Sequence, residues 1–137
     1  MIVLADTSGL FALLVKNDHM HVRAKLNFQY FSEHRAQLLT SSFVLIETIA
    51  LLQRRVGLAA IHDFQSKIIP LLEIIWVYND LYTKAVQRLF ILNRRGISLV
   101  DCISFEIMES RGITQAFTFD EHFLEIGFTL APFHDLD

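Results

Sequence analysis

The chain has 137 residues, which is enough for one compact domain and too few for two. Its 12 basic and 15 acidic residues give a formal net charge of -3, which excludes binding of nucleic acid by bulk positive charge alone. Hydrophobic residues make up 53% of the chain. That excess predicts either a large core or an apolar surface that a partner covers.

The sequence also bears on location. A single cysteine, Cys102, cannot form an intrachain disulfide, which fits a reducing compartment. The opening residues MIVLADTSGL carry no basic segment and reach Asp6 too early for a secretory signal. No apolar run approaches the roughly 20 residues that span a bilayer. We therefore expect a soluble, cytoplasmic protein that makes no membrane contact.

The first half of the chain predicts two short strands, each followed by two helices. Residues 2–5 are all apolar and end at Asp6, which is typical of a buried parallel strand. Ser41 or Ser42 can cap the third helix, Gly57 can end it, and Pro70 can close the fourth. The expected elements are a strand over 2–5, helices over 8–16 and 18–32, a strand over 37–40, and helices over 43–55 and 58–69.

The second half repeats the alternation. Asn79 or Asp80 can cap a long helix that Gly96 ends, and Ser98 can cap a helix that ends near Gly112. The expected elements are a strand over 72–78, helices over 80–94 and 99–112, a strand over 116–119, a short helix from 120 and a weak strand over 127–131. This alternation predicts an α/β fold: a parallel sheet of roughly five strands, covered by helices on both faces, in a single domain over 1–137.

Four acidic residues are expected at the carboxyl edge of that sheet, where ligands bind in such folds. Asp6 ends the first strand and Asp120 follows the fourth, while Glu47 and Asp101 lie in the opening turns of helices that start from the same edge. The three aspartates also have an ordinary explanation. Asp6 and Asp120 could cap the helices that follow them, and Asp101 with Ser98 fits a capping box.

Glu47 does not fit such an explanation. Phe43 and Leu51 are its i-4 and i+4 neighbours, so Glu47 is expected within an apolar helix face. A carboxylate buried there needs a cation, either an arginine or a metal ion. Asp101 similarly shares its face with apolar Phe105 and Met108.

Four gathered carboxylates repel each other unless they hold a divalent cation, and oxygen ligands favour Mg²⁺ or Mn²⁺. Zinc is disfavoured because no Cys or His pair has ligand spacing, and the six histidines are interpreted as surface or packing residues. A carboxylate metal site suits phosphate chemistry, since metal ions bridge phosphate oxygens and activate water. Thr7, Ser8 and Ser98 beside the acids could position substrate or water, or simply cap helices.

Four segments carry a resemblance to a known family: DTS at 6–8, SSFVLIET at 41–48, SLVD at 98–101 and TFDEHF at 118–123. In this order and spacing, across nearly the whole chain, the sequence resembles PIN domains and is most similar to the toxin nucleases of VapBC-type toxin–antitoxin systems. The resemblance implies a three-layer α/β/α sandwich and a metal-dependent endoribonuclease that leaves 5′-phosphate and 3′-hydroxyl ends. It also implies a homodimer and a small antitoxin whose tail covers the active site.

The resemblance assigns roles to the acids. It implies that Asp6, Glu47, Asp101 and Asp120 are the quartet that holds Mg²⁺ or Mn²⁺, with Asp120 the weakest match. It implies that Thr7 or Ser8 is the small polar residue after the first aspartate, and that Ser98 is the hydroxyl before the third acid. Cys102 stands where a small residue such as alanine is usual, which is expected to affect packing and not chemistry.

Some basic and apolar residues have two interpretations. Arg54, Arg55, Arg94 and Arg95 could contact RNA phosphates, or be ordinary charges near helix ends. Some apolar residues of the helices between 8 and 69 could form a dimer face and an antitoxin groove, although most are expected to be core. They are Phe11, Leu14, Phe28, Tyr30, Phe31 and Phe64.

Three alternatives to a toxin nuclease were considered. A housekeeping PIN ribonuclease would lack a neighbouring gene for a small DNA-binding protein. A non-catalytic PIN-like domain that binds RNA or protein predicts a broken acidic set, yet all four acids are present. A phosphorylation-receiver domain fails because Thr7 follows the first aspartate, the third predicted strand ends without an acceptor aspartate, and no lysine follows Lys84.

Overall fold

Five parallel strands form one sheet with the order β3-β2-β1-β4-β5 in the computed structural model, which describes residues 1–132. The strands are β1 (Ile2–Ala5), β2 (Gln37–Ser41), β3 (Leu72–Ile75), β4 (Gln115–Phe117) and β5 (Thr129–Leu130). The central strand β1 pairs with both neighbours, so that Leu4 lies opposite Leu39 of β2 and Ala116 of β4. This confirms the predicted parallel sheet; the last five residues of the predicted domain lie outside the described residues.

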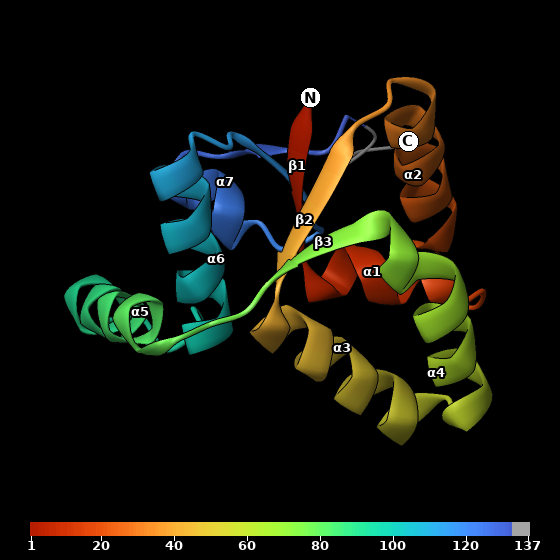
Figure 1. The fold of residues 1–137 in the computed structure, drawn as a ribbon, viewed down its shortest axis with the longest axis horizontal. Coiled ribbons are helices and arrows are strands. Elements are labelled where there is room, and N and C mark those ends of the chain that lie inside the picture. The colour runs from red at the N-terminus through yellow and green to blue at the C-terminus, as the bar shows by residue number, and fades with distance from the viewer. Residues whose placement is uncertain (133–137) are drawn as a thin grey trace.

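Within residues 1–132, seven α-helices cover the sheet on both faces. They are α1 (Thr7–Leu14), α2 (His21–Glu33), α3 (Ser42–Arg55), α4 (Leu58–Asp63), α5 (Asn79–Leu92), α6 (Leu99–Arg111) and α7 (His122–Ile126). Helices α1 to α4 lie on one side of the sheet and α5 to α7 on the other (Figure 1). The fold is therefore the three-layer α/β/α sandwich that the resemblance implied. No helix within residues 1–132 is long and apolar enough to cross a membrane.

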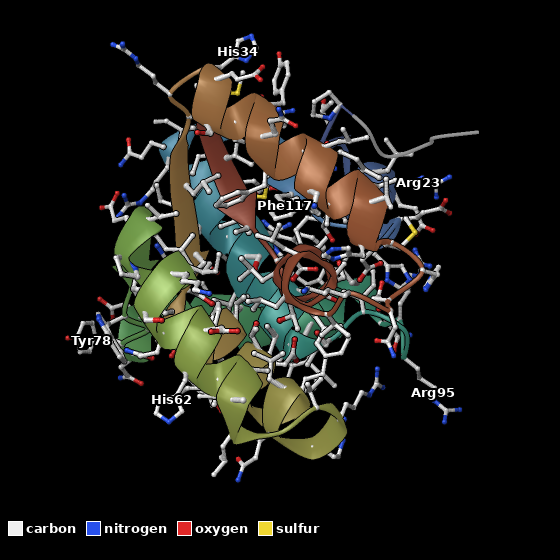
Figure 2. The ribbon with its side chains drawn as sticks, turned by 90° about the vertical axis from the view of Figure 1, so that its right-hand side faces the viewer. Arg23, His34, His62, Tyr78, Arg95 and Phe117 are labelled. Carbon is white, nitrogen blue, oxygen red and sulfur yellow. The ribbon has the colours of Figure 1, made fainter. Side chains whose placement is uncertain are left out.

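Alternation along β1 divides the core into two hydrophobic clusters. Val3 and Ala5 pack into the cluster beneath α1 to α4, whereas Leu4 packs into the cluster beneath α5 to α7. In the first cluster the rings of Phe117 and Phe31 meet edge to face, with their centroids 5.6 Å apart. Figure 2 shows Phe117 at the centre of the molecule, beneath α2. Each face of the sheet thus has its own core.

Two predicted boundaries were wrong for reasons that lie in neighbouring elements. The third strand was expected to reach Tyr78 but ends at Ile75, because the backbone N–H of Val77 donates a hydrogen bond to Oγ of Ser42 at 2.9 Å instead of pairing with β2. Helix α5 ends at Leu92 instead of the expected Arg94, because Asn93, and not Gly96, takes the left-handed conformation that ends it, with φ of 50°.

The helix expected over 58–69 changes type twice. Helix α4 is followed by a π-helical turn η1 (Phe64–Ile68) and a 3₁₀ turn η2 (Ile69–Leu71). Pro70 lies within η2, where its missing N–H cannot continue α-helical hydrogen bonding. The first and last residues of the π turn, Phe64 and Ile68, are both buried in the core.

Candidate active site

The four predicted acids meet at the carboxyl edge of the sheet, the lower edge in Figure 1, where α1, α3 and α6 begin. Negative charge on Asp101 and on Asp120 raises the pKa of Asp6, and charge on Asp120 and Glu47 raises the pKa of Asp101. A carboxylate oxygen of Asp101 and one of Asp120 lie within 4.8 Å of each other. The fold therefore brings all four side chains into one electrostatic cluster.

Asp6 is the most deeply buried of the four. It is only 4% exposed, and its side chain makes no capping hydrogen bond to α1, so the ordinary explanation of this residue does not hold. Its Oδ2 instead accepts hydrogen bonds from the hydroxyls of Thr118, at 2.8 Å, and Ser8, at 3.3 Å. Burial, and then the charge of Asp101, raise the pKa of Asp6 to about 7, although the hydrogen bond from Thr118 acts in the opposite direction.

Thr118 is a site residue that the sequence interpretation missed. Its fully buried hydroxyl donates to Asp6 and accepts the backbone N–H of Asp120 at 3.0 Å. Ser8 completes this network, because its Oγ lies 3.0 Å from Oγ1 of Thr118 and accepts the N–H of Phe119 at 2.9 Å. Ala5 pairs with Phe117 in the sheet, so the next residues on the two strands, Asp6 and Thr118, become neighbours. The pairing of β1 with β4 would have indicated Thr118 as a site residue. The order of the strands, however, could not be predicted from the sequence.

Gly9 allows this network to form. A Cβ at Gly9 would lie 2.5 Å from the carbonyl oxygen of Phe117, closer than such atoms can approach. Glycine therefore lets α1 pack directly on the end of β4. That contact brings Ser8 to Thr118.

Asp101 both caps its helix and belongs to the acidic cluster. Its Oδ2 accepts the backbone N–H of Ser98 at 3.1 Å, and its own N–H donates to Oγ of Ser98 at 3.1 Å, so the predicted capping box is present. Asp101 is nevertheless only 8% exposed, and burial is the main cause of its raised pKa. The hydroxyl of Ser98 thus holds Asp101 in place. The adjacent Cys102 is fully buried in the core.

Asp120 precedes α7 and is partly buried. Its Oδ1 accepts the backbone N–H of His122 at 2.9 Å, so this aspartate also supports the start of the following helix. A ring nitrogen of His122 lies within 4.8 Å of carboxylate oxygens of both Asp101 and Asp120. The structure thus brings a histidine to the cluster, whereas all six histidines had been interpreted as surface or packing residues.

Glu47 does not have the predicted environment. It is exposed and not buried, while Phe43 and Leu51 on the same side of α3 are only partly buried. Helix spacing identifies a shared face but not whether another element covers it, and at this edge the sheet has already ended. The expected need of a buried Glu47 for a cation was therefore wrong, although Glu47 still lies near enough to Asp101 to affect its pKa.

Thr7 and the six candidate apolar residues make contacts within the fold. The hydroxyl of Thr7 is buried and accepts a hydrogen bond from Thr48 of α3 at 3.4 Å, which ties α1 to α3. The six apolar residues weighed for a partner surface are buried in the first hydrophobic cluster or partly buried against it. Phe11, Phe31 and Phe64 are the buried members, as expected of core residues, whereas Leu14, Phe28 and Tyr30 are only partly buried.

The four candidate arginines differ in their surroundings. Arg94 forms an ion pair with Glu125 of α7, and Arg95 extends away from the molecule (Figure 2). Arg54 is exposed in the last turn of α3. Arg55 lies over the ring of Phe11, 5.8 Å from its centroid, and lines a hollow of about 320 Å³ that also includes Ser8. Arg55 thus shares a hollow with Ser8, whose hydroxyl donates to Asp6.

Comparison with known proteins identifies the family. Residues 3–129 match the PIN domain family, and the chain belongs to it. Over 127 residues the chain is 33% identical to the 23S rRNA-specific endonuclease VapC20 of Mycobacterium tuberculosis strain CDC 1551 / Oshkosh, a match that covers 92% of this chain and 95% of the relative. The same protein from strain H37Rv matches equally.

The fold agrees with a solved structure of that relative. The crystal structure of M. tuberculosis VapC20, described as a sarcin-ricin loop cleaving toxin, matches with a TM-score of 0.81 and 32% sequence identity. The match covers 94% of this chain and 97% of that chain. Both the PIN-like fold and the similarity to VapC-type toxins that the sequence predicted are confirmed.

Proposed function

We propose that this protein is a metal-dependent endoribonuclease, the toxin of a toxin–antitoxin pair, which hydrolyses RNA phosphodiesters to 5′-phosphate and 3′-hydroxyl ends. The observation that carries the proposal is the convergence of Asp6, Glu47, Asp101 and Asp120 at one edge of the sheet. The similar VapC20 is named as an endonuclease specific for 23S rRNA, which supports RNA as the substrate class.

The cluster fits a divalent metal ion. Neighbouring carboxylates and burial raise the pKa of Asp6 to about 7, so without a cation this site resists holding its full negative charge. Carboxylate oxygens are the donors that Mg²⁺ and Mn²⁺ accept, and the four acids would hold the ion. When bound, such an ion activates water and stabilises the charge that develops on the phosphate and the leaving oxygen.

The surrounding residues position these acids. Thr118 and Ser8 orient Oδ2 of Asp6, and the backbone N–H of Ser98 holds Oδ2 of Asp101. Asp120 is tied to Thr118 through its backbone N–H. Glu47 is exposed, so its carboxylate is accessible to an arriving phosphate.

Arg55 is our candidate for RNA contact near the acids. It shares a hollow with Phe11, Phe119 and Ser8, and Ser8 donates a hydrogen bond to Asp6. Unstacked RNA bases bind on aromatic rings and guanidinium planes, and phosphates bind arginine. This combination supports a role in holding the strand next to the site of cleavage.

The proposal includes a small antitoxin partner, a homodimer and a cytoplasmic location. Exposed apolar side chains on and before α5, namely Trp76, Tyr78, Phe90 and Ile91, support burial against another chain. Light scattering of the purified protein tests the dimer, and a clean monomer would count against it.

The activity is tested with a labelled, structured RNA and the partner-free protein. We expect cleavage with Mg²⁺ or Mn²⁺, none with EDTA, and none with Asp6→Asn or Asp101→Asn. Circular dichroism of both variants controls for folding. Cleavage that persists in EDTA or in both variants would overturn the proposed site.

A further inference from the structure

His122 is the first residue of α7 and faces the acidic cluster. One of its ring nitrogens lies within 4.8 Å of carboxylate oxygens of Asp101 and Asp120. Its side chain is only 26% exposed. The position is therefore fixed by the fold rather than being one of many positions open to a surface side chain.

The ring is held with one edge away from the acids. A Cβ built on Gly96, in the loop between α5 and α6, would lie 3.4 Å from both Cε1 and Nε2 of His122, so this edge packs against the loop. Nδ1, which is bonded to Cε1 on the side away from Nε2, lies 2.9 Å from Oδ1 of Asp120. Packing against Gly96 thus leaves Nδ1 as the nitrogen that faces the carboxylates.

Nδ1 lies at ion-pair distance from Oδ1 of Asp120 but makes no hydrogen bond within residues 1–132. It is buried and, despite its short distance to Asp120, is not aligned for a hydrogen bond with that oxygen or with any other atom of residues 1–132. A buried polar nitrogen without a hydrogen-bond partner is unfavourable. A cation between Nδ1 and the carboxylates would satisfy the nitrogen and the acids together.

We propose that His122 is a further ligand of the metal site, supplying Nδ1 beside Asp101 and Asp120, and that the site consequently prefers a transition-metal ion to Mg²⁺. The inference rests on the metal dependence proposed above. Imidazole nitrogen is a common ligand for transition-metal ions, whereas Mg²⁺ takes oxygen ligands and retains its water. A site made only of carboxylates lacks this nitrogen ligand that favours transition-metal ions over Mg²⁺.

In the test, Mn²⁺ is added to the tag-free protein and the bound ion is examined by electron paramagnetic resonance. Pulsed measurements on bound Mn²⁺ detect a coupled ¹⁴N nucleus when imidazole is a ligand. We expect this coupling in the wild type and its absence in His122→Ala and His122→Asn. His62→Ala is the matched control, because His62 is exposed on α4 and points outward (Figure 2). It should keep the coupling.

Affinity gives a second readout. Titration should show His122→Ala weakening Mn²⁺ binding by about tenfold while Mg²⁺ binding changes by less than about twofold. Equal losses for both ions, or a loss of stability without a ¹⁴N signal in the wild type, would reduce His122 to a packing residue.

The outcomes separate the two proposals. Mn²⁺ bound in an Asp101-dependent way but without ¹⁴N coupling overturns the role of His122 and leaves the proposed function standing. Coupling that survives in both His122 variants also overturns it. If the wild type binds no Mn²⁺ at all, this result overturns both the role of His122 as a metal ligand and the proposed metal-dependent function.

Discussion

The hydroxyl of Thr118 donates a hydrogen bond to Oδ2 of Asp6 across 2.8 Å, joining the residue after β4 to the residue after β1. The hydroxyl oxygen of Thr118 also accepts the backbone N–H of Asp120 at 3.0 Å. One uncharged side chain therefore fixes the relation between two acids of the cluster. It does so without adding a positive charge that would compete with a metal ion.

Thr118→Val removes this link while nearly keeping the volume of the side chain. The hydrogen bond lowers the pKa of Asp6, so its loss should raise that pKa further and weaken Mn²⁺ binding by about tenfold. Thr118→Ser keeps the hydroxyl and should bind within about twofold of the wild type. Isothermal titration calorimetry would compare them, and equal affinities in the valine and serine variants would contradict the assigned role.

Asp6→Asn should stabilise the metal-free fold at neutral pH while abolishing cleavage. The pKa of Asp6 is about 7 in the folded chain against a model value of 3.8, so between these values the folded state keeps a proton that the unfolded state has lost. The contribution of Asp6 to stability is thus fully present below about pH 4 and is lost as the pH rises to about 7.

The measurement is urea unfolding in EDTA at pH 5 and pH 8. At pH 8 the free energy of unfolding of Asp6→Asn should exceed that of the wild type by on the order of 2–4 kcal/mol. At pH 5 this difference should be smaller. Saturating Mg²⁺ should make the wild type the more stable protein, because only the wild type gains the full free energy of metal binding. A variant less stable than the wild type at pH 8 without metal would contradict the electrostatic argument.

Gly9→Ala should distort the site by separating α1 from β4. The added methyl group would lie 2.5 Å from a backbone oxygen that cannot move without disturbing the sheet. We expect a loss of about 1–3 kcal/mol in the free energy of unfolding, together with weaker metal binding as Ser8 leaves Thr118. For the free energy of unfolding alone, Gly96→Ala is the control, since its methyl group would meet only the His122 ring, at 3.4 Å. Similar stability of both variants would show that the close approach is not needed.

Arg55→Ala should weaken RNA binding more than Arg54→Ala. The two residues are adjacent at the end of α3, but only Arg55 lines the hollow that contains Ser8. Fluorescence anisotropy in EDTA, at several salt concentrations, would separate a phosphate contact from a general charge effect. Loss of one phosphate contact should reduce the slope of log affinity against log salt by roughly 0.7–1. Equal slopes for both variants would exclude this assignment.

The sequence predicted the sheet edge because short apolar runs end at polar residues there. Asp6, Asp101 and Asp120 could be placed together from their position at strand ends or in a capping box, which are local features. The burial of these acids could not be predicted from such local features. Glu47 has apolar neighbours along α3, yet whether that face is covered depends on elements distant in sequence.

The residues missed in the site share one cause. Thr118, Gly9 and His122 act through contacts with segments that meet only after the strand order is set. Nothing about a threonine, a glycine or a histidine in isolation distinguishes these from other residues of the same type. Knowing that β1 and β4 are neighbours would have indicated Thr118 at once.

The two separate cores have a consequence for the newly made chain. Asp6 and Glu47 are placed by β1 and by α1 and α3 on one side of the sheet, whereas Asp101 is placed by α6 on the other. A chain that has assembled only one side holds an incomplete set of acids. Because α6, Thr118 and Asp120 follow the first three strands along the chain, the acids come together only when β4 pairs with β1 and α6 packs on the far face.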